Sequence, residues 1–189
     1  HIEARALGVE LIVGTELSMN DGTSIVLLAE NLIGYQNLCQ LLSGVHLKTK
    51  HKNNVFADWN DVFSLSRGLI LILTGNSIFQ QKVEPMILSK RIAESFTASV
   101  YVGISRHQIS KLKSREKDTI LRAKRYGFPI VAVNEVLYHC KKRQPLQDIL
   151  TCISSGKSLK SAGPLLKPNN EYYLLSAPNF YKRFKDKPH

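Results

Sequence analysis

Short apolar runs rich in β-branched residues alternate along the chain with segments of helical periodicity. The runs are nearly continuous rather than alternating apolar and polar, which is typical of strands buried in a parallel sheet. The strands that this pattern predicts are 10–13, 24–29, 69–74, 99–104 and 129–133. The helices predicted between them are 35–43, 84–96 and 114–126. Alternating strands and helices favour an α/β fold that is layered or barrel-like.

Turn residues mark two of the boundaries between these elements. Asn20-Asp21-Gly22 predicts a tight turn that fits a hairpin between the first two strands. Gly127-Phe128-Pro129 ends the last of these helices and begins the following strand, because glycine terminates helices and proline cannot continue them. The hydropathy pattern and the turn chemistry therefore agree on where these elements begin and end.

The alternation of strands and helices stops near residue 140. Beyond it, 145–153 predicts a helix with a proline in its first turn. Residues 154–170 are rich in Ser, Gly, Lys and Pro and predict an extended connector, and 178–184 predicts a last short helix. We therefore expect one domain over 1–140, and over 141–189 its end and a connector toward a following domain.

Positive charge is distributed unevenly along the chain. The formal net charge is +11, yet residues 1–45 contain one basic and five acidic residues, so residues 46–189 carry +15. Basic residues cluster at 111–117, 122–125, 141–143 and 182–185. Such a field favours a polyanionic partner such as nucleic acid. The alternative is a solvated basic surface that keeps the protein in solution.

The cysteines and the hydropathy of the chain indicate its redox environment and whether it contacts a membrane. The three cysteines, Cys39, Cys140 and Cys152, are odd in number and lack C-x-x-C spacing, which argues against a disulfide framework and a structural zinc site. We therefore expect a reducing, cytoplasmic location. No apolar run approaches the roughly 20 residues that span a bilayer, so no membrane contact is expected. The first residues lack Met and a signal-peptide pattern, and we expect residue 1 to be a truncation point.

Three polar side chains follow predicted strands and are candidates for metal ligation. Glu16 follows a glycine after the first strand, His107 comes just past 99–104, and Glu135 follows 129–133. Carboxylates and imidazoles at strand ends suit metal binding or proton transfer. Taken singly, each is as easily an exposed polar group. His139 and Cys140 could add ligands to Glu135, but the adjacent Lys141-Lys142-Arg143 disfavours a cation there.

Several familiar catalytic motifs are missing from the sequence. It contains no G-x-x-x-x-G-K-[ST] phosphate loop, no G-x-G-x-x-G fingerprint and no G-x-S-x-G nucleophile elbow. It also lacks an acidic pair of the D-x-D type that would hold two metal ions. The residues alone therefore indicate a basic α/β domain, with at most a degenerate metal site.

Several separated blocks occur in one order along the sequence: 11–17, 26–31, 34–38, 101–107, 129–136 and 146–153, continuing to Tyr173-Leu174 and Phe184. Together these blocks resemble the PHP (polymerase and histidinol phosphatase) domain of bacterial C-family DNA polymerases, the DNA polymerase III alpha-subunit family. The resemblance covers nearly the whole chain. Two blocks, 134–139 and 147–152, are more similar to the error-prone, translesion branch than to the replicative branch.

The resemblance implies a particular fold, a PHP-type distorted (βα) barrel that is truncated at its N-terminus. The family's opening strand with paired histidines, and the Asp/His motif after it, would lie before residue 1. We therefore expect an opened barrel with exposed apolar strand edges, and a fragment that is prone to aggregation or poorly stable alone. A sharp two-state melt of a soluble monomer would contradict that expectation.

The resemblance also implies a metal site whose ligands are incomplete. Glu16 and His107 match the family's ligand pattern, whereas Glu135 stands in place of an aspartate and matches only in charge. Leu137 occupies a position where intact sites have a histidine, and leucine cannot bind a metal. Zinc or manganese would be the cofactor if this site is functional, and magnesium would serve the polymerase domain outside this chain. A multi-metal centre needs several ligands at once, so the site is expected to be vestigial.

Three functions follow as alternatives. The first is a scaffold domain of an error-prone DNA polymerase that acts in damage-associated translesion synthesis, with DNA, the sliding clamp and other accessory proteins as partners of the full-length chain. On this view the fragment itself is not catalytic. The second is a metal-dependent phosphoesterase or a 3′–5′ proofreading exonuclease, which intact PHP sites imply. The third is a basic α/β interaction module without a polymerase. The first is the prediction that we carry forward.

Overall fold

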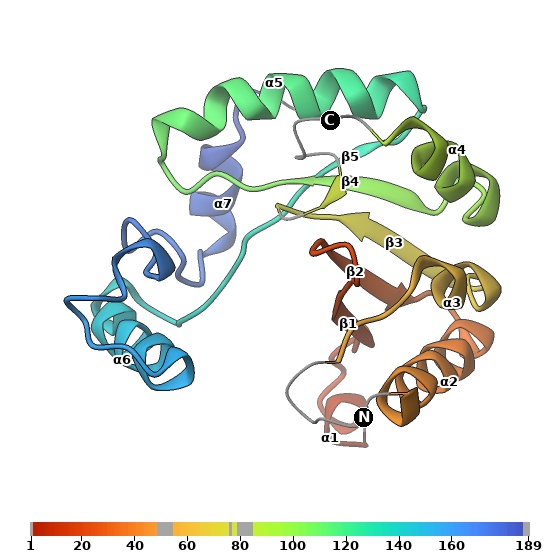
Figure 1. Cartoon of the computed structure of the whole chain (residues 1–189), viewed down its shortest axis with the longest axis horizontal. Coiled ribbons are helices and arrows are strands. Elements are labelled where there is room, and N and C mark those ends of the chain that lie inside the picture. Colours follow the sequence, from red (N-terminus) through yellow and green to blue (C-terminus); the bar gives the residue numbers. More distant parts are fainter. Residues whose placement is uncertain (1, 49–54, 76, 79–84, 187–189) are drawn as a thin grey trace. The chain divides into compact units, whose positions relative to one another are not determined.

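The computed structural model describes residues 2–48, 55–75, 77–78 and 85–186 (Figure 1). Internal contacts divide the chain into two compact units. The sheet unit comprises residues 1–104 and 114–131, and the C-terminal unit comprises residues 105–113 and 132–189. The domain boundary predicted after residue 140 stays a prediction, because this division by contacts follows a different criterion.

A five-stranded sheet organises the described part of the chain, in the order β1-β2-β3-β4-β5. Neighbouring strands β1 to β4 follow one another across the sheet in Figure 1. Together with the helices around it, the sheet confirms the predicted mixed α/β class. The strands are β1 Gly14–Ser18, β2 Ser24–Ala29, β3 Leu69–Leu73, β4 Val100–Ile104 and β5 Ile130–Ala132.

The continuous apolar runs predicted parallel strands, but the strands do not all run parallel. Strand β2 is antiparallel to both β1 and β3, whereas β3 and β4 pair in parallel. The predicted hairpin explains part of this. Asn20-Asp21-Gly22 forms the turn, with Gly22 at φ +80°, and Ser18 pairs with Ser24 across it. Burial on both faces gives a strand a continuous apolar run in either direction, so hydropathy alone did not determine orientation.

The first strand lies later in the chain than predicted. It covers Gly14–Ser18 instead of 10–13. The turn fixes the register of the two strands, because pairing begins next to it with Ser18 opposite Ser24. The paired residues then extend to Gly14, which lies opposite Leu28. The apolar residues just before β1, which the prediction placed in or beside the first strand, are exposed; they are Val9, Leu11, Ile12 and Val13.

Helices in the sheet unit agree with the predictions in place but not always in length. Helix α2 extends beyond the predicted 35–43 at both ends, and the predicted starts of α4 and α5 differ by a few residues, residue 84 lying outside the described residues. The short helix α3 was not predicted, because six residues are too few to show a helical period, whereas α1 lies where the first residues have a helix-like register. The bounds are α1 Ile2–Ala6, α2 Leu32–Lys48, α3 Trp59–Ser64, α4 Met86–Ser95 and α5 Ser110–Arg125.

The main hydrophobic cluster of the described residues lies within the sheet unit. Helix α2 contributes Leu38, Leu41 and Val45, which share one helical face, to the same buried cluster as strands β2 and β3. The start of α2 approaches the turn before β3 so closely that a Cβ at Gly34 would lie 1.7 Å from the carbonyl oxygen of Gly68. Glycine at position 34 therefore allows the helix to approach the sheet.

Beyond residue 140 the C-terminal unit contains two α-helices, as the pattern predicted. It also contains two short 3-10 helices, η2 Lys141–Arg143 and η3 Gly163–Leu165, and the second lies within the segment predicted to be an extended connector. Helix α6 spans Gln144–Ser155 and helix α7 spans Ala177–Arg183. An isolated parallel bridge between Tyr138 and Tyr173 ties the two ends of this unit together. No helix in the described ranges is long and apolar enough to cross a membrane.

Candidate functional site

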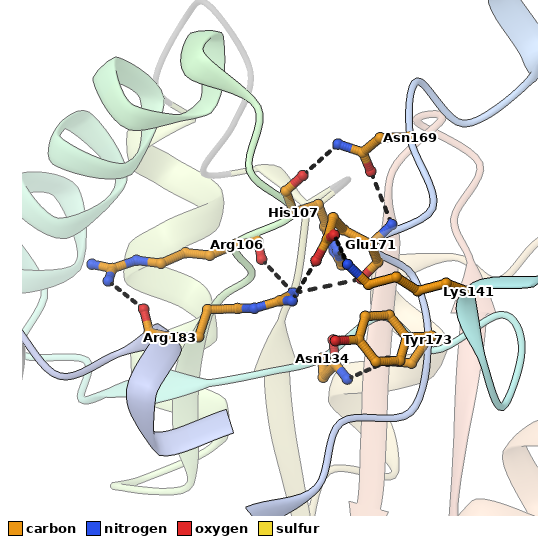
Figure 2. A network of polar contacts seen from close by, with 8 residues as sticks. All are labelled: Arg106, His107, Asn134, Lys141, Asn169, Glu171, Tyr173 and Arg183. Carbon is orange, nitrogen blue, oxygen red and sulfur yellow. Dashed lines mark hydrogen bonds and ion pairs between the residues drawn. The ribbon is translucent and has the colours of Figure 1, made fainter. Parts of the chain in front are cut away.

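A buried carboxylate, Glu171, lies at the centre of the C-terminal unit (Figure 2). Its Oε2 accepts a hydrogen bond from Nη2 of Arg183 at 2.7 Å, and its Oε1 is paired with the ammonium of Lys141. The Glu171 and Arg183 side chains are only 7% and 11% exposed, so the two charges are largely removed from water. Two cations around one carboxylate compensate that desolvation.

Arg183 also connects the end of helix α7 to Arg106. The Arg183 Nη1 donates to the main-chain oxygen of Arg106 at 2.8 Å, and the Arg106 Nη1 donates to the main-chain oxygen of Arg183 at 2.9 Å. Arg106 is further paired with Asp186 and lies 5.0 Å from the ring centre of Phe184. These contacts fix α7 onto the segment that carries His107.

His107 is buried beside this network. Its ring stacks on Tyr172 with centroids 3.9 Å apart and planes inclined by 14°, and its Nδ1 lies 3.4 Å from the main-chain oxygen of Glu171. Asn169 positions both segments, because its Nδ2 donates to the His107 carbonyl at 2.7 Å and its Oδ1 accepts from the Glu171 N–H at 3.1 Å. The imidazole is therefore held by stacking on one face and by a main-chain acceptor at its edge.

Glu135 is the carboxylate that approaches the imidazole. Its Oε2 lies 3.5 Å from Nε2 of His107, and its Oε1 lies 3.3 Å from Nζ of Lys167. The contact with His107 is the largest cause that lowers the pKa of Glu135, and Lys167 adds to it against the opposing effect of burial. The Lys167 ammonium also lies 4.6 Å from the ring centre of Tyr172. An internal cation thus neutralises the carboxylate at this point.

The three predicted metal ligands are distributed over both units. His107 and Glu135 are brought together in the C-terminal unit, whereas Glu16 belongs to the sheet unit. Glu16 was predicted to follow the end of the first strand. It lies instead in the middle of β1 and is exposed. The side chains of a strand alternate between its faces, and in this register Leu17 is the buried one. The main-chain N–H of Leu137 donates a hydrogen bond to the Tyr172 carbonyl at 2.8 Å, and the Leu137 side chain has no ligating atom.

The side chains near His107 do not fit a multi-metal centre. The described ranges contain no group of three or more His, Cys, Asp or Glu side chains that could hold a metal ion. The pair formed by His107 and Glu135 offers two donors, and the Lys167 ammonium already lies against one of them. A cation would have to compete with that ammonium for Glu135.

The sequence prediction missed the residues that hold this unit together. Lys167 lies in the segment predicted as a connector, Arg183 lies in the predicted terminal helix, and Glu171 lies between the two. One signal could have identified Glu171, because it is one of only four acidic residues among thirteen basic ones in the C-terminal unit. Those residues give the unit a formal charge of +9, whereas the larger sheet unit carries +2.

Comparison with known proteins supplies the family context. The family model described as "PHP domain" matches residues 1–96. The chain is 31% identical over 179 residues to an error-prone DNA polymerase of Pseudomonas syringae pv. tomato, covering 95% of this chain and 17% of that protein. Error-prone DNA polymerases of Anaeromyxobacter sp. (strain K) and Pseudomonas aeruginosa are 27% and 31% identical over 100% and 90% of this chain. The chain thus spans only 16–17% of the length of these curated relatives.

Proposed function

The chain belongs to the PHP-domain family, and from that membership we propose that it is the PHP-domain portion of an error-prone DNA polymerase. Its mixed α/β architecture is consistent with a PHP-type barrel. In this proposal nucleotidyl transfer takes place in polypeptide outside the chain, in the cytoplasm, during damage-associated translesion synthesis. The chain itself has a structural role and is not catalytic.

One observation carries the polymerase assignment. The family model ends at residue 96, but the likeness to error-prone DNA polymerases continues through the C-terminal unit and covers 90–100% of the chain. A likeness restricted to residues 1–96 would have left the choice among PHP proteins open. Its continuation over the basic C-terminal unit favours the polymerase context.

The surroundings of Glu135 support a degenerate metal site. Lys167 places its ammonium group 3.3 Å from the Glu135 carboxylate, and Leu137 provides no ligand. Metal-assisted hydrolysis needs a cation that lowers the pKa of bound water, held by several ligands in fixed geometry. A lysine ammonium neutralises the carboxylate without supplying either property. The pair of His107 and Glu135 then stabilises the unit.

The charge of the C-terminal unit supports a role in contacting DNA. Its formal charge of +9 is large for 67 residues, and it contains the exposed run Lys141-Lys142-Arg143. Contacts of this kind reach phosphates, are independent of sequence and weaken as salt increases. The sliding clamp and other accessory proteins are proposed as partners of the full-length polymerase.

Primer extension and metal titration on the full-length protein test this proposal. We expect template-directed synthesis that persists in the double variant His107→Ala/Glu135→Ala, provided that this variant remains folded by circular dichroism. Loss of synthesis in a folded double variant would contradict a purely structural role. Absence of synthesis by the unaltered full-length protein would contradict the polymerase assignment.

The phosphoesterase alternative is favoured by one contact, the 3.5 Å approach of His107 to Glu135. Zinc and manganese calorimetry on the same protein separates it from the proposal. We expect no stoichiometric zinc binding. Tight binding that is lost with Glu16→Ala and His107→Ala, accompanied by release of 3′-terminal nucleotides, would instead favour the exonuclease.

A further inference from the structure

Helix α6 of the C-terminal unit is amphipathic, but unlike an ordinary surface helix it exposes its aliphatic face and packs its polar face against the unit. Its large aliphatic residues recur at i, i+3, i+4 and i+7, so they form one stripe. All four are 46–71% exposed. We call this set the α6 stripe; it consists of Leu146, Ile149, Leu150 and Ile153.

The opposite face of α6 is the one that packs against the unit. Cys152 is buried, and the polar residues Gln147, Asp148 and Thr151 are half-buried. Thr151 satisfies its hydroxyl within the helix, by donating to the Gln147 carbonyl at 2.9 Å. A surface helix of a globular domain normally buries its aliphatic stripe and exposes its polar face. This reversal indicates that the α6 stripe is an interface for something other than the C-terminal unit.

Basic residues flank the α6 stripe at both ends of the helix. Lys142 and Arg143 are exposed just before its first turn, and Lys157 and Lys160 are exposed just after its end. The only acidic residue of the helix, Asp148, lies on the half-buried face. The exposed surface is therefore apolar over about 10 Å, the rise of seven residues, with positive charge at both ends. A complementary partner carries an apolar stripe flanked by carboxylates.

We propose that the α6 stripe docks an amphipathic helix with acidic flanks, supplied by the same polypeptide outside residues 1–189. The proposal rests on the proposed function, in which this chain is part of a longer polymerase. The curated relatives share the α6 region and are far longer, since the chain spans 16–17% of their length. Helix-on-helix packing of this kind uses anchors at i, i+3, i+4 and i+7.

The charges argue against a second copy of the chain as the occupant. In an antiparallel pair of α6 helices, Lys142 and Arg143 of one copy would face Lys157 and Lys160 of the other. In a parallel pair each basic end would face its own counterpart. Both arrangements bring like charges together beside an apolar contact, which opposes association.

Photo-crosslinking on the full-length protein tests the proposal. p-Benzoylphenylalanine is introduced at Leu150, in the stripe, and as a matched control at Leu174, which is exposed in the same unit but lies outside α6. We expect irradiation at position 150 to give a crosslink within one molecule, to a peptide beyond residue 189 or before residue 1 that contains Asp or Glu. Position 174 is expected to give at least tenfold less of that product.

Each other result overturns the inference. A crosslinked species of twice the mass would identify a second copy as the occupant, and a crosslink within residues 1–189 would identify this chain itself. Absence of a crosslink at position 150 would show a solvated stripe. Ile153→Glu gives an independent readout: it is expected to increase the rate of limited proteolysis of the full-length protein severalfold, and an unchanged rate in a folded variant counts against docking.

The outcome is separable from that of the proposed function. Primer extension by the unaltered full-length protein reports on the polymerase assignment and does not depend on the crosslink. Synthesis without the crosslink would reject docking and keep the assignment. The crosslink without synthesis would reject the assignment and keep docking.

Discussion

Each of the two units of this protein is stabilised internally by a different kind of interaction. The sheet unit has a continuous apolar core that includes Leu27, Leu71 and Val102. The C-terminal unit has few buried aliphatic residues among its described part and is centred on the buried carboxylate of Glu171 with two cations around it. Dispersion and hydrophobic burial tolerate partial repacking, whereas a buried charge is strongly destabilising once its buried partner is removed.

This contrast extends to the surfaces of the two units. The sheet unit is nearly neutral at +2, and the C-terminal unit carries +9 and exposes the α6 stripe. A unit with little apolar interior and a strongly charged exterior depends on fixed polar contacts for its shape. The comparison teaches that the part with the weakest hydrophobic signal in the sequence contains the most specific side-chain geometry. The following changes test that difference.

Glu171→Gln is expected to have the largest effect, because it leaves the guanidinium of Arg183, whose side chain is only 11% exposed, without its carboxylate. Removal of one partner from a buried pair costs about 4 kcal/mol of unfolding free energy. Hydrogen exchange should report lost protection over 169–183, while the fluorescence transition of Trp59, the single tryptophan, stays unchanged in the sheet unit. Asp148→Asn, which removes another carboxylate of the unit, is the control. An equal shift at Trp59 would mean that the two units unfold together.

Leu71→Ala tests the other unit by opening a cavity beneath β3. Leu71 is fully buried and pairs with Leu27 and Val100 on the neighbouring strands. We expect a loss of about 3 kcal/mol, measured as a lower urea midpoint of Trp59 fluorescence. Leu121→Ala, at an exposed position of α5, should leave the midpoint within error. A small effect at Leu71 would show that the core repacks more freely than its burial indicates.

Asp21→Asn tests a polar contact inside the apolar unit and is expected to cost about 1 kcal/mol at neutral pH. The Asp21 carboxylate accepts hydrogen bonds from Trp59 Nε1 at 2.9 Å and from the Thr23 N–H at 2.9 Å. Burial alone would raise the pKa of Asp21, but these hydrogen bonds outweigh it and lower the pKa. The stabilisation is therefore present above the unfolded pKa of about 3.9 and is lost as pH falls through the lower folded value.

The corresponding measurement is the melting temperature of both proteins between pH 7 and pH 2. The difference between the unaltered protein and Asp21→Asn should shrink below about pH 4. A difference that stayed constant over this range would show that the carboxylate's charge does not contribute.

Lys141→Met is expected to have the smallest effect, about 0.5 kcal/mol, because the Lys141 side chain is 45% exposed and Arg183 still faces Glu171. The hydrogen bond to Glu171 raises the pKa of Lys141. Its contribution is thus complete below the unfolded lysine pKa and is lost as pH rises through the higher folded value. Arg183→Met, measured by the same hydrogen exchange, should be clearly more destabilising, and equal effects would refute the asymmetry.

Much of the sheet unit could be predicted from the sequence. The strand at 24–29 has the predicted bounds, the turn at Asn20-Asp21-Gly22 forms the expected hairpin, and the later strands differ by a residue or two at their ends. Apolar runs and turn residues are local signals, because they follow from the burial of single strands and from φ preferences. Strand direction is not local: the continuous apolar runs predicted parallel strands, but β2 pairs antiparallel with β3, and only the turn residues indicated the antiparallel pairing of β1 with β2.

Less of the candidate site could be predicted. The helix at 145–153 was placed correctly, yet its hydropathy could not show that its aliphatic stripe faces outward. The resemblance named Glu16, His107 and Glu135 together, and the structure joins only the last two in one unit. Lys167 and Glu171 lie more than thirty residues from Glu135 in sequence and lack any motif.

The sequence by itself therefore determined the alternating core elements, the uneven charge and the family, because these depend on composition and on short-range order. Only the tertiary structure decided which charges meet. Glu171 gains Lys141 and Arg183, and Glu135 gains Lys167, when chain segments far apart in sequence fold back on one another. Charged and hydrogen-bonding groups interact according to their distance in space. A lysine in a basic segment therefore has the same local sequence whether its ammonium is solvated or, like that of Lys167, lies against a carboxylate.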